Sequence, residues 1–108
     1  MAAPRTVSDP TTDEAATFVN EAIEQGALVT LFGRCTVEYE GRAASELGPG
    51  DRHVMLKPDG TALVHTDEGQ EPVNWQPPGC DHDCRADEDV LVMESVRTSP
   101  AERLTVSF

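Results

Sequence analysis

The sequence predicts a mainly β, antiparallel domain with one N-terminal α-helix. Three observations support this fold class: one stretch near the start has helical periodicity, short β-type runs follow it, and Gly- and Pro-containing turns separate those runs. The length of 108 residues allows one small domain. No apolar run approaches a membrane span, and residues 1–10 lack a signal-peptide core. We therefore expect a soluble, cytoplasmic protein with a flexible lead-in at 1–10 and a single domain at 11–108.

The helix is the first element that the sequence predicts. Thr11 and Glu14 have the spacing of a capping box, in which each side chain accepts a hydrogen bond from the other residue's backbone N–H. Apolar residues then recur at helical spacing, at Ala15, Phe18, Val19, Ala22 and Ile23. These signals predict a helix from Thr12 to Gln25, with Gly26 at its C-terminal cap.

After residue 26 the apolar pattern changes from helical spacing to short β-type runs. Gly33, Glu40–Gly41, Pro49–Gly50 and the turn at 58–60 are predicted to separate the first strands. Residues 69–79 contain three prolines and are predicted to form a stiff extended loop rather than a strand. Strands are therefore expected at 27–32, 35–39, 42–47, 52–57, 61–65, 90–96 and 103–108.

The chain is strongly acidic, with 20 acidic and 8 basic side chains and a net charge of −12. Seven of the basic residues are arginine and Lys57 is the only lysine, a composition that suits high salt and a halophilic source. Residues 31–57 carry four positive and four negative charges, so the whole net charge lies outside this window. An anionic ligand would approach there most easily, although an acidic protein that avoids nucleic acid has the same composition.

A Cys-x-His-x-Cys group at Cys80, His82 and Cys84 resembles a set of metal ligands. Zinc sites, however, usually join two clusters that are distant in sequence, and the other candidates are scattered singly at Cys35, His53 and His65. A disulfide between Cys80 and Cys84 would be unusual in a reducing cytoplasm. We expect solvated loop residues here, with no metal site, and a buried thiol at Cys35.

The sequence lacks two common catalytic signatures. It has no Gly-x-Ser-x-Gly nucleophile motif. Many Mg²⁺-dependent nucleases place an acidic residue two positions before a catalytic lysine, whereas Met55 precedes Lys57 here. The acidic run at 81–89 is expected to be a solvated surface. No catalytic residue is therefore predicted on this chain.

The most informative motifs lie in the middle of the chain, and they occur in a fixed order. They are Phe32-Gly33-Arg34-Cys35, Tyr39-Glu40-Gly41-Arg42-Ala43, Gly50-Asp51-Arg52, Lys57-Pro58-Asp59-Gly60, Leu63-Val64-His65 and Pro72-Val73-Asn74-Trp75-Gln76-Pro77-Pro78-Gly79. This series resembles the N-terminal domain of the NucS/EndoMS endonucleases of archaea and some bacteria. The likeness runs without gaps over residues 27–79, and continues more loosely through Arg97, Pro100 and Glu102-Arg103-Leu104.

The resemblance implies a half-open antiparallel β-barrel or sandwich that dimerises and binds DNA. In this family a separate RecB-like domain cuts single-stranded flaps, branched DNA and mismatched duplexes with Mg²⁺, often with a sliding clamp as partner. The chain stops where the linker to that domain would begin, so it is expected to be inactive alone. It should hold no cofactor itself, with Mg²⁺ and clamp binding confined to the absent region. The expected partners are a second copy and single-stranded, flap or mismatched DNA, with no membrane.

Five matching residues are predicted to contact DNA: Arg42, Trp75, Asn74, Tyr39 and Arg34. Trp75 would offer a platform for an unpaired base, although a lone tryptophan more often fills a core. Arg42 would form two hydrogen bonds to a phosphate or stack on a base, and the alternative is a solvated turn residue. Asn74 would form hydrogen bonds to a base edge, and the alternative is hydrogen bonding to the local backbone. Tyr39 can instead pack across the sheet, and Arg34 can pair with Glu38.

Two features depart from the family pattern. Relatives from hyperthermophiles carry basic residues before Pro72, where this chain has Glu68, Gln70 and Glu71, so contact with the DNA backbone should be weaker at low salt. The Cys-Asp-His-Asp-Cys segment after Gly79 has no counterpart in that pattern. Two other functions stay open: a dimerisation or regulatory module that does not bind DNA, and a small metal-binding protein.

Overall fold

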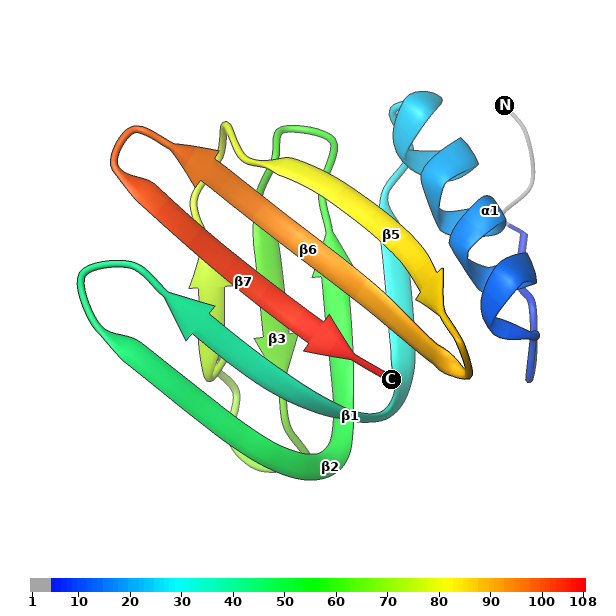
Figure 1. The fold of residues 1–108 in the computed structure, drawn as a ribbon, viewed down its shortest axis with the longest axis horizontal. Coiled ribbons are helices and arrows are strands. Elements are labelled where there is room, and N and C mark those ends of the chain that lie inside the picture. Colours follow the sequence, from blue (N-terminus) through cyan, green and yellow to red (C-terminus); the bar gives the residue numbers. More distant parts are fainter. Residues whose placement is uncertain (1–4) are drawn as a thin grey trace.

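The computed structural model describes residues 5–108, which form one seven-stranded antiparallel sheet and one helix, α1 (Thr12–Glu24) (Figure 1). The strands follow each other in the sheet in the order β4-β3-β2-β1-β7-β6-β5, which leaves β4 and β5 as edges. The predicted mainly β, half-open fold is therefore confirmed. The strand bounds are β1 Val29–Glu40, β2 Ala44–Leu56, β3 Ala62–His65, β4 Asn74–Gln76, β5 Asp81–Asp87, β6 Val90–Thr98 and β7 Ala101–Ser107.

Residues 1–4 of the predicted lead-in lie outside the described residues. Within the part that the structure describes, no helix has the length and apolar character needed to cross a membrane.

Helix α1 begins where its sequence signals place it. The Thr11 hydroxyl accepts a hydrogen bond from the Glu14 N–H at 3.2 Å, and the Glu14 carboxylate accepts one from the Thr11 N–H at 3.3 Å. Gly26 has a positive φ of 71°, the conformation that ends many helices. Ala16 and Val19 are buried where the helix packs over β5 and β6. The predicted helix is confirmed to within one residue.

The two longest strands are bent, and the bend turns one sheet into two facing halves (Figure 1). Residues 29–35 and 37–40 of β1 pair with β2, whereas only Thr36–Glu40 pairs with β7. The register shifts between Cys35 and Val37, which is the signature of a bulge and sharpens the local twist. The first half of the sheet thus contains β4, β3 and the adjoining ends of β1 and β2. The second half contains β5, β6, β7 and the hairpin that joins β1 to β2.

The prediction that Gly33 and Pro49–Gly50 separate strands is wrong, since they lie inside β1 and β2. A Cβ on Gly33 would come within 3.2 Å of the Phe108 ring, and one on Gly50 within 3.2 Å of the Arg52 guanidinium. Glycine is used there for close packing at the bend, not for a turn. The other glycine-containing hairpin, at Glu40–Gly41, is confirmed.

The core lies between the two halves. The fully buried side chains come from strands on both sides, and the helix closes one end; they include Val37, Val54, Leu56, Val64, Met93, Leu104 and Val106. Burial of this apolar surface is the main force that holds the bent sheet in shape.

The acidic segment that sequence reasoning treated as a solvated loop is the edge strand β5. Its residues alternate, with Asp81, Asp83 and Asp87 exposed and Cys84 buried in the core. Helix residue Asn20 covers the free edge: its amide donates to the Cys84 carbonyl at 2.7 Å and its oxygen accepts from the Cys84 N–H at 3.0 Å. Covering an edge in this way protects it from pairing with another chain.

The prediction of an uninterrupted loop at 69–79 is also wrong. Asn74, Trp75 and Gln76 form strand β4, in which Trp75 lies opposite Leu63 of β3. Proline cannot donate to a sheet, and the strand is confined to the three residues between Val73 and Pro77. A strand this short can form because it pairs with β3, and the sequence of β4 alone does not reveal this pairing.

Candidate nucleic-acid interface

The indole of Trp75 projects into solvent. Its side chain is 60 % exposed, so the alternative in which a lone tryptophan fills the core does not hold here. Strand alternation sends the next side chain, Gln76, in the opposite direction, where it is fully buried and its Nε2 donates to the Ser95 carbonyl at 3.0 Å. The buried amide therefore anchors β4 and fixes the direction of its neighbouring ring.

The backbone on both sides of β4 is also tied down. The Val73 N–H donates to the Val64 carbonyl at 2.8 Å, and the Gly79 N–H donates to the Asp59 carbonyl at 2.8 Å. Asn74 is half-buried and faces the same side of the sheet as Gln76, opposite to Trp75. The two predicted contacts at β4 are thus adjacent in sequence but present their side chains on different faces.

Arg42 is exposed in the turn of the β1–β2 hairpin. The turn is closed by a hydrogen bond from the Gly41 N–H to the Ala43 carbonyl at 3.0 Å. A Cβ on Gly41 would lie 2.5 Å from the Tyr39 hydroxyl, so only glycine fits there without movement. Among residues 5–108, Arg42 has no salt-bridge partner, which leaves its guanidinium free for an external anion.

Tyr39 lies beside this turn and is held by a small polar network. Its hydroxyl donates to one oxygen of Glu102, while the other oxygen accepts from the Arg97 guanidinium at 3.1 Å. The hydrogen bond with Glu102 raises the pKa of Tyr39, and the same bond, helped by Arg97, lowers the pKa of Glu102. The structure thus brings Tyr39 and Arg42 to the same end of the sheet, and adds Arg97 and Glu102 to that neighbourhood.

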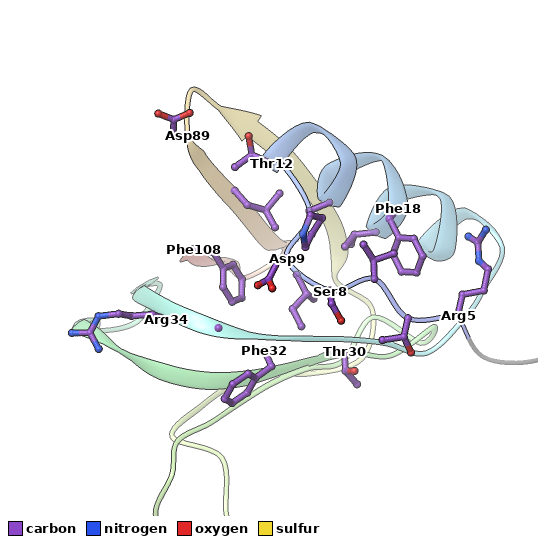
Figure 2. Close-up of a pocket in the computed structure, with 18 residues that line it drawn as sticks. Arg5, Ser8, Asp9, Thr12, Phe18, Thr30, Phe32, Arg34, Asp89 and Phe108 are labelled. Atoms are coloured by element: carbon purple, nitrogen blue, oxygen red, sulfur yellow. The ribbon is translucent and has the colours of Figure 1, made fainter.

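Arg34 is exposed on β1 and lies opposite Asp51 of β2. The alternative pairing with Glu38 is disfavoured, because four residues along a strand span about 13 Å. Arg34 also lines a cleft of about 710 Å³, which lies between the chain before α1, the helix, β1 and Phe108 (Figure 2). Arg5 stacks over the Phe18 ring at 5.0 Å in the same cleft.

The structure separates the predicted contact residues into two groups. Trp75 and Asn74 lie on edge strand β4, in the first half of the sheet, while Arg42 and Tyr39 lie at the hairpin end in the second half. The strand row of Trp75 reaches β1 at Thr30, at the opposite end of that strand from the hairpin. The sheet register alone therefore does not bring Arg42 and Trp75 together within one chain.

The Cys-x-His-x-Cys group does not form a compact ligand set. Alternate residues of a strand are about 6.7 Å apart, which places Cys80 and Cys84 about 13 Å apart, too far for one zinc ion or a disulfide. No group of three or more potential metal ligands occurs within residues 5–108, and all three cysteines are free and buried. Burial raises the pKa of each thiol, that of Cys84 to about 12.

Sequence reasoning missed Phe32, the most exposed of the large apolar side chains in the described part of the chain, at 76 %. Figure 2 shows its ring and that of Phe108 on opposite sides of β1, in agreement with the packing of Phe108 over Gly33. The available signal was the alternation of β1, in which Leu31 turns toward the core and Phe32 away from it.

This chain is similar in sequence and in fold to known proteins. Residues 25–108 match the family described as the Endonuclease NucS N-terminal PH-like domain. Endonuclease NucS of Thermococcus kodakarensis is 46 % identical over 102 residues, which are 94 % of this chain and 40 % of the relative. Endonuclease NucS of Pyrococcus horikoshii is 48 % identical over 103 residues, which are 95 % of this chain and 39 % of the relative.

Among solved structures, that of an EndoMS–dsDNA2 complex is similar with a TM-score of 0.89 and 45 % identity, and the match covers 94 % of this chain and 42 % of the other. The chain thus spans about 40 % of the length of its curated relatives. The family match covers the whole sheet, from before β1 to Phe108. The chain belongs to the NucS endonuclease family and corresponds to its N-terminal domain.

Proposed function

We propose that this domain binds DNA for a structure- or mismatch-specific repair endonuclease, and that it recognises unpaired, flap or flipped bases as a homodimer. The observation that carries the proposal is the indole of Trp75, 60 % exposed on a strand that is anchored from its other face by Gln76. A rigid exposed ring stacks on any unpaired base without reading its sequence. Extrusion of a base costs least where pairing is already faulty, which favours mismatches.

The hairpin supplies the second part of the proposed contact. Arg42 is exposed and without an ion-pair partner among the described residues, and a guanidinium binds phosphate oxygens through two parallel hydrogen bonds. The proposal assigns additional polar contacts to Arg34 and Asn74, and Tyr39 borders the hairpin. Arg42 and Trp75 lie in different halves of one sheet, and in this proposal they contact different nucleotides, or the same nucleotide when two copies combine.

No residue of this chain is assigned a catalytic role in the proposal. Cleavage, the Mg²⁺ that it needs and any contact with a sliding clamp are assigned to the part of the relatives' length that this chain does not cover. The domain alone should therefore bind DNA without cutting it.

The test is a comparison of the 108-residue chain with Trp75→Ala, in which binding of dye-labelled single-stranded and mismatched oligonucleotides is followed by anisotropy in 1 M KCl. Loss of one stacked base should weaken binding about 5- to 150-fold, since such a contact contributes about 1–3 kcal/mol. Val90→Ala, at an exposed apolar residue of β6, is the matched control and should bind as the parent chain does.

The competing function is a dimerisation or regulatory module that has no affinity for DNA. The net charge of −12 is the observation in its favour. It would be supported by equally negligible binding of both variants and the parent chain, together with a dimer in sedimentation experiments.

A further inference from the structure

The convex side of the first half-sheet carries a second exposed aromatic ring on the same face as Trp75. We call this surface the outer face. Register places its side chains in two adjacent rows across the strands: Trp75, Leu63, Met55 and Thr30 in one, and His65, His53 and Phe32 in the other. Trp75 and Phe32 lie at opposite corners, and they are 60 % and 76 % exposed.

The charge of the outer face differs from that of the rest of the molecule. None of its seven residues carries a carboxylate, although the chain has 20 acidic residues in 108. In the next row along the strands, Arg34 and Asp51 lie opposite each other, and their charges cancel. A polyanion therefore meets no carboxylate within this face, and the exposed rings there have the chemistry that stacks on bases.

The rings are held by regular sheet and not by a loop. β1 and β2 pair continuously through Phe32 and His53, and β2 and β3 pair through His53 and His65. On the concave side of β1 the Phe108 ring packs against Gly33, so β1 cannot rotate to bury Phe32 without losing that contact. The exposure of Phe32 is thus fixed by the fold, as that of Trp75 is.

We infer that Phe32 is a second stacking platform, and that a single strand of DNA crosses the outer face diagonally from Trp75 to Phe32 past the two imidazoles. The inference rests on the proposed function and extends it from one base to a short strand. Three strand spacings and one two-residue step separate the rings by about 16 Å along the face. Stacked neighbouring bases are about 3.4 Å apart, so a dinucleotide reaches only one of the rings.

The length of the oligonucleotide supplies the test. Binding of dye-labelled dT2 and dT8 is measured by anisotropy in 1 M KCl for the parent chain and for Phe32→Leu, Phe32→Trp and Trp75→Ala. Phe32→Leu should weaken dT8 binding about fivefold or more and leave dT2 binding unchanged, since one stacked base is lost. Phe32→Trp keeps an aromatic ring at this position and should retain the affinity for dT8. The contrast with Phe32→Leu distinguishes stacking on a ring from contact with an apolar side chain. Trp75→Ala should weaken binding of both oligonucleotides.

Three results would overturn the inference. If Phe32→Leu binds dT8 as the parent chain does while Trp75→Ala does not, Phe32 is not a contact and the proposed function stands. If Phe32→Leu leaves dT8 binding intact but converts a dimer to a monomer in sedimentation, the face is a protein interface. If the parent chain binds neither oligonucleotide, the proposed function fails and the second platform fails with it. Circular dichroism of each variant confirms that it is folded.

Discussion

Two neighbouring residues, Trp75 and Gln76, show how a single strand separates two functions. The amide is buried and bonded to the Ser95 carbonyl, whereas the ring is exposed. Since successive side chains point to opposite faces, the burial of Gln76 in the core directs Trp75 to the other face of the sheet, where its ring is exposed. A polar side chain in the core thus positions an aromatic side chain on the surface.

At this scale His82 makes the stability of the domain depend on pH. Burial lowers the pKa of His82 below its ordinary value, because the charged imidazolium is poorly solvated there, although nearby backbone groups of Thr61 and Lys57 oppose the shift. The unfolded chain therefore takes up a proton as the pH falls below about 6.5, while the folded chain does not. The free energy of unfolding should therefore be highest above that pH, and it should decrease as the pH falls through the pKa that His82 has in the folded chain.

The corresponding measurement is the urea midpoint of unfolding between pH 7.5 and 5.5, with the ring of His82 titrated by NMR. The variant His82→Gln cannot titrate, so it should lose most of this pH dependence. An equal decrease in the parent chain and in His82→Gln would assign the effect to other groups.

At the scale of elements, the two edges of the sheet are treated differently. β5 is covered by Asn20 of α1, which satisfies both the N–H and the carbonyl of Cys84. β4 is left open but has only three residues and is followed by Pro77. Both solutions reduce pairing with other chains. The short edge also carries the exposed ring of Trp75.

Removal of the Asn20 side chain should therefore destabilise the contact between helix and sheet. Asn20→Ala breaks two hydrogen bonds and should lower the free energy of unfolding by about 1–3 kcal/mol. Asn20→Asp keeps the acceptor for the Cys84 N–H, so its free energy of unfolding should lie between those of the parent chain and Asn20→Ala. Thr17→Ala, at an exposed position of the same helix, is the control for urea denaturation. A change no larger than that of the control would show that the cover contributes nothing.

The sequence predicts those elements whose signals are local. The capping box and the apolar spacing of α1 lie within the helix itself, so its bounds follow from about fifteen residues. β5 also had a local signal, because Asp81, Asp83 and Asp87 alternate with residues of lower polarity, but the acidic side chains obscured it. The bend in β1 and β2 could not be predicted, since whether a glycine ends a strand or bends it depends on the strand opposite.

The candidate site was predicted in part for the same reason. The exposure of Arg42 follows from its place in a turn with a clear signature. That Trp75 and Arg42 lie in different halves of the sheet depends on the fold of strands far apart in sequence, and so does the shared face of Trp75 and Phe32.

On the scale of the whole molecule, the net charge of −12 opposes the approach of DNA, whereas in the proposed function the outer face and the hairpin bind it at short range. Long-range repulsion is screened over about 10 Å at 0.1 M salt and about 3 Å at 1 M, whereas stacking and bidentate hydrogen bonds act at contact. Salt should therefore remove more of the repulsion than of the attraction.

We expect the affinity for dT8 to be at least as high in 1 M KCl as in 0.1 M KCl. A basic DNA-binding protein behaves in the opposite way and loses about 10³- to 10⁵-fold between 50 and 200 mM salt when it makes six to ten phosphate contacts. Anisotropy titrations across this range measure the slope. A steep decrease with salt would show that phosphate contacts, and not stacking, dominate binding.

The burial of Cys35, Cys80 and Cys84 has a practical consequence for observing this molecule at work. Maleimide dyes react with exposed thiolates, and burial keeps all three sulfurs protonated and out of reach. A fluorophore can therefore be attached through Ala43→Cys in the exposed hairpin without replacing any native sulfur. Energy transfer from that dye to one on an oligonucleotide would then track single binding events on the otherwise unmodified chain.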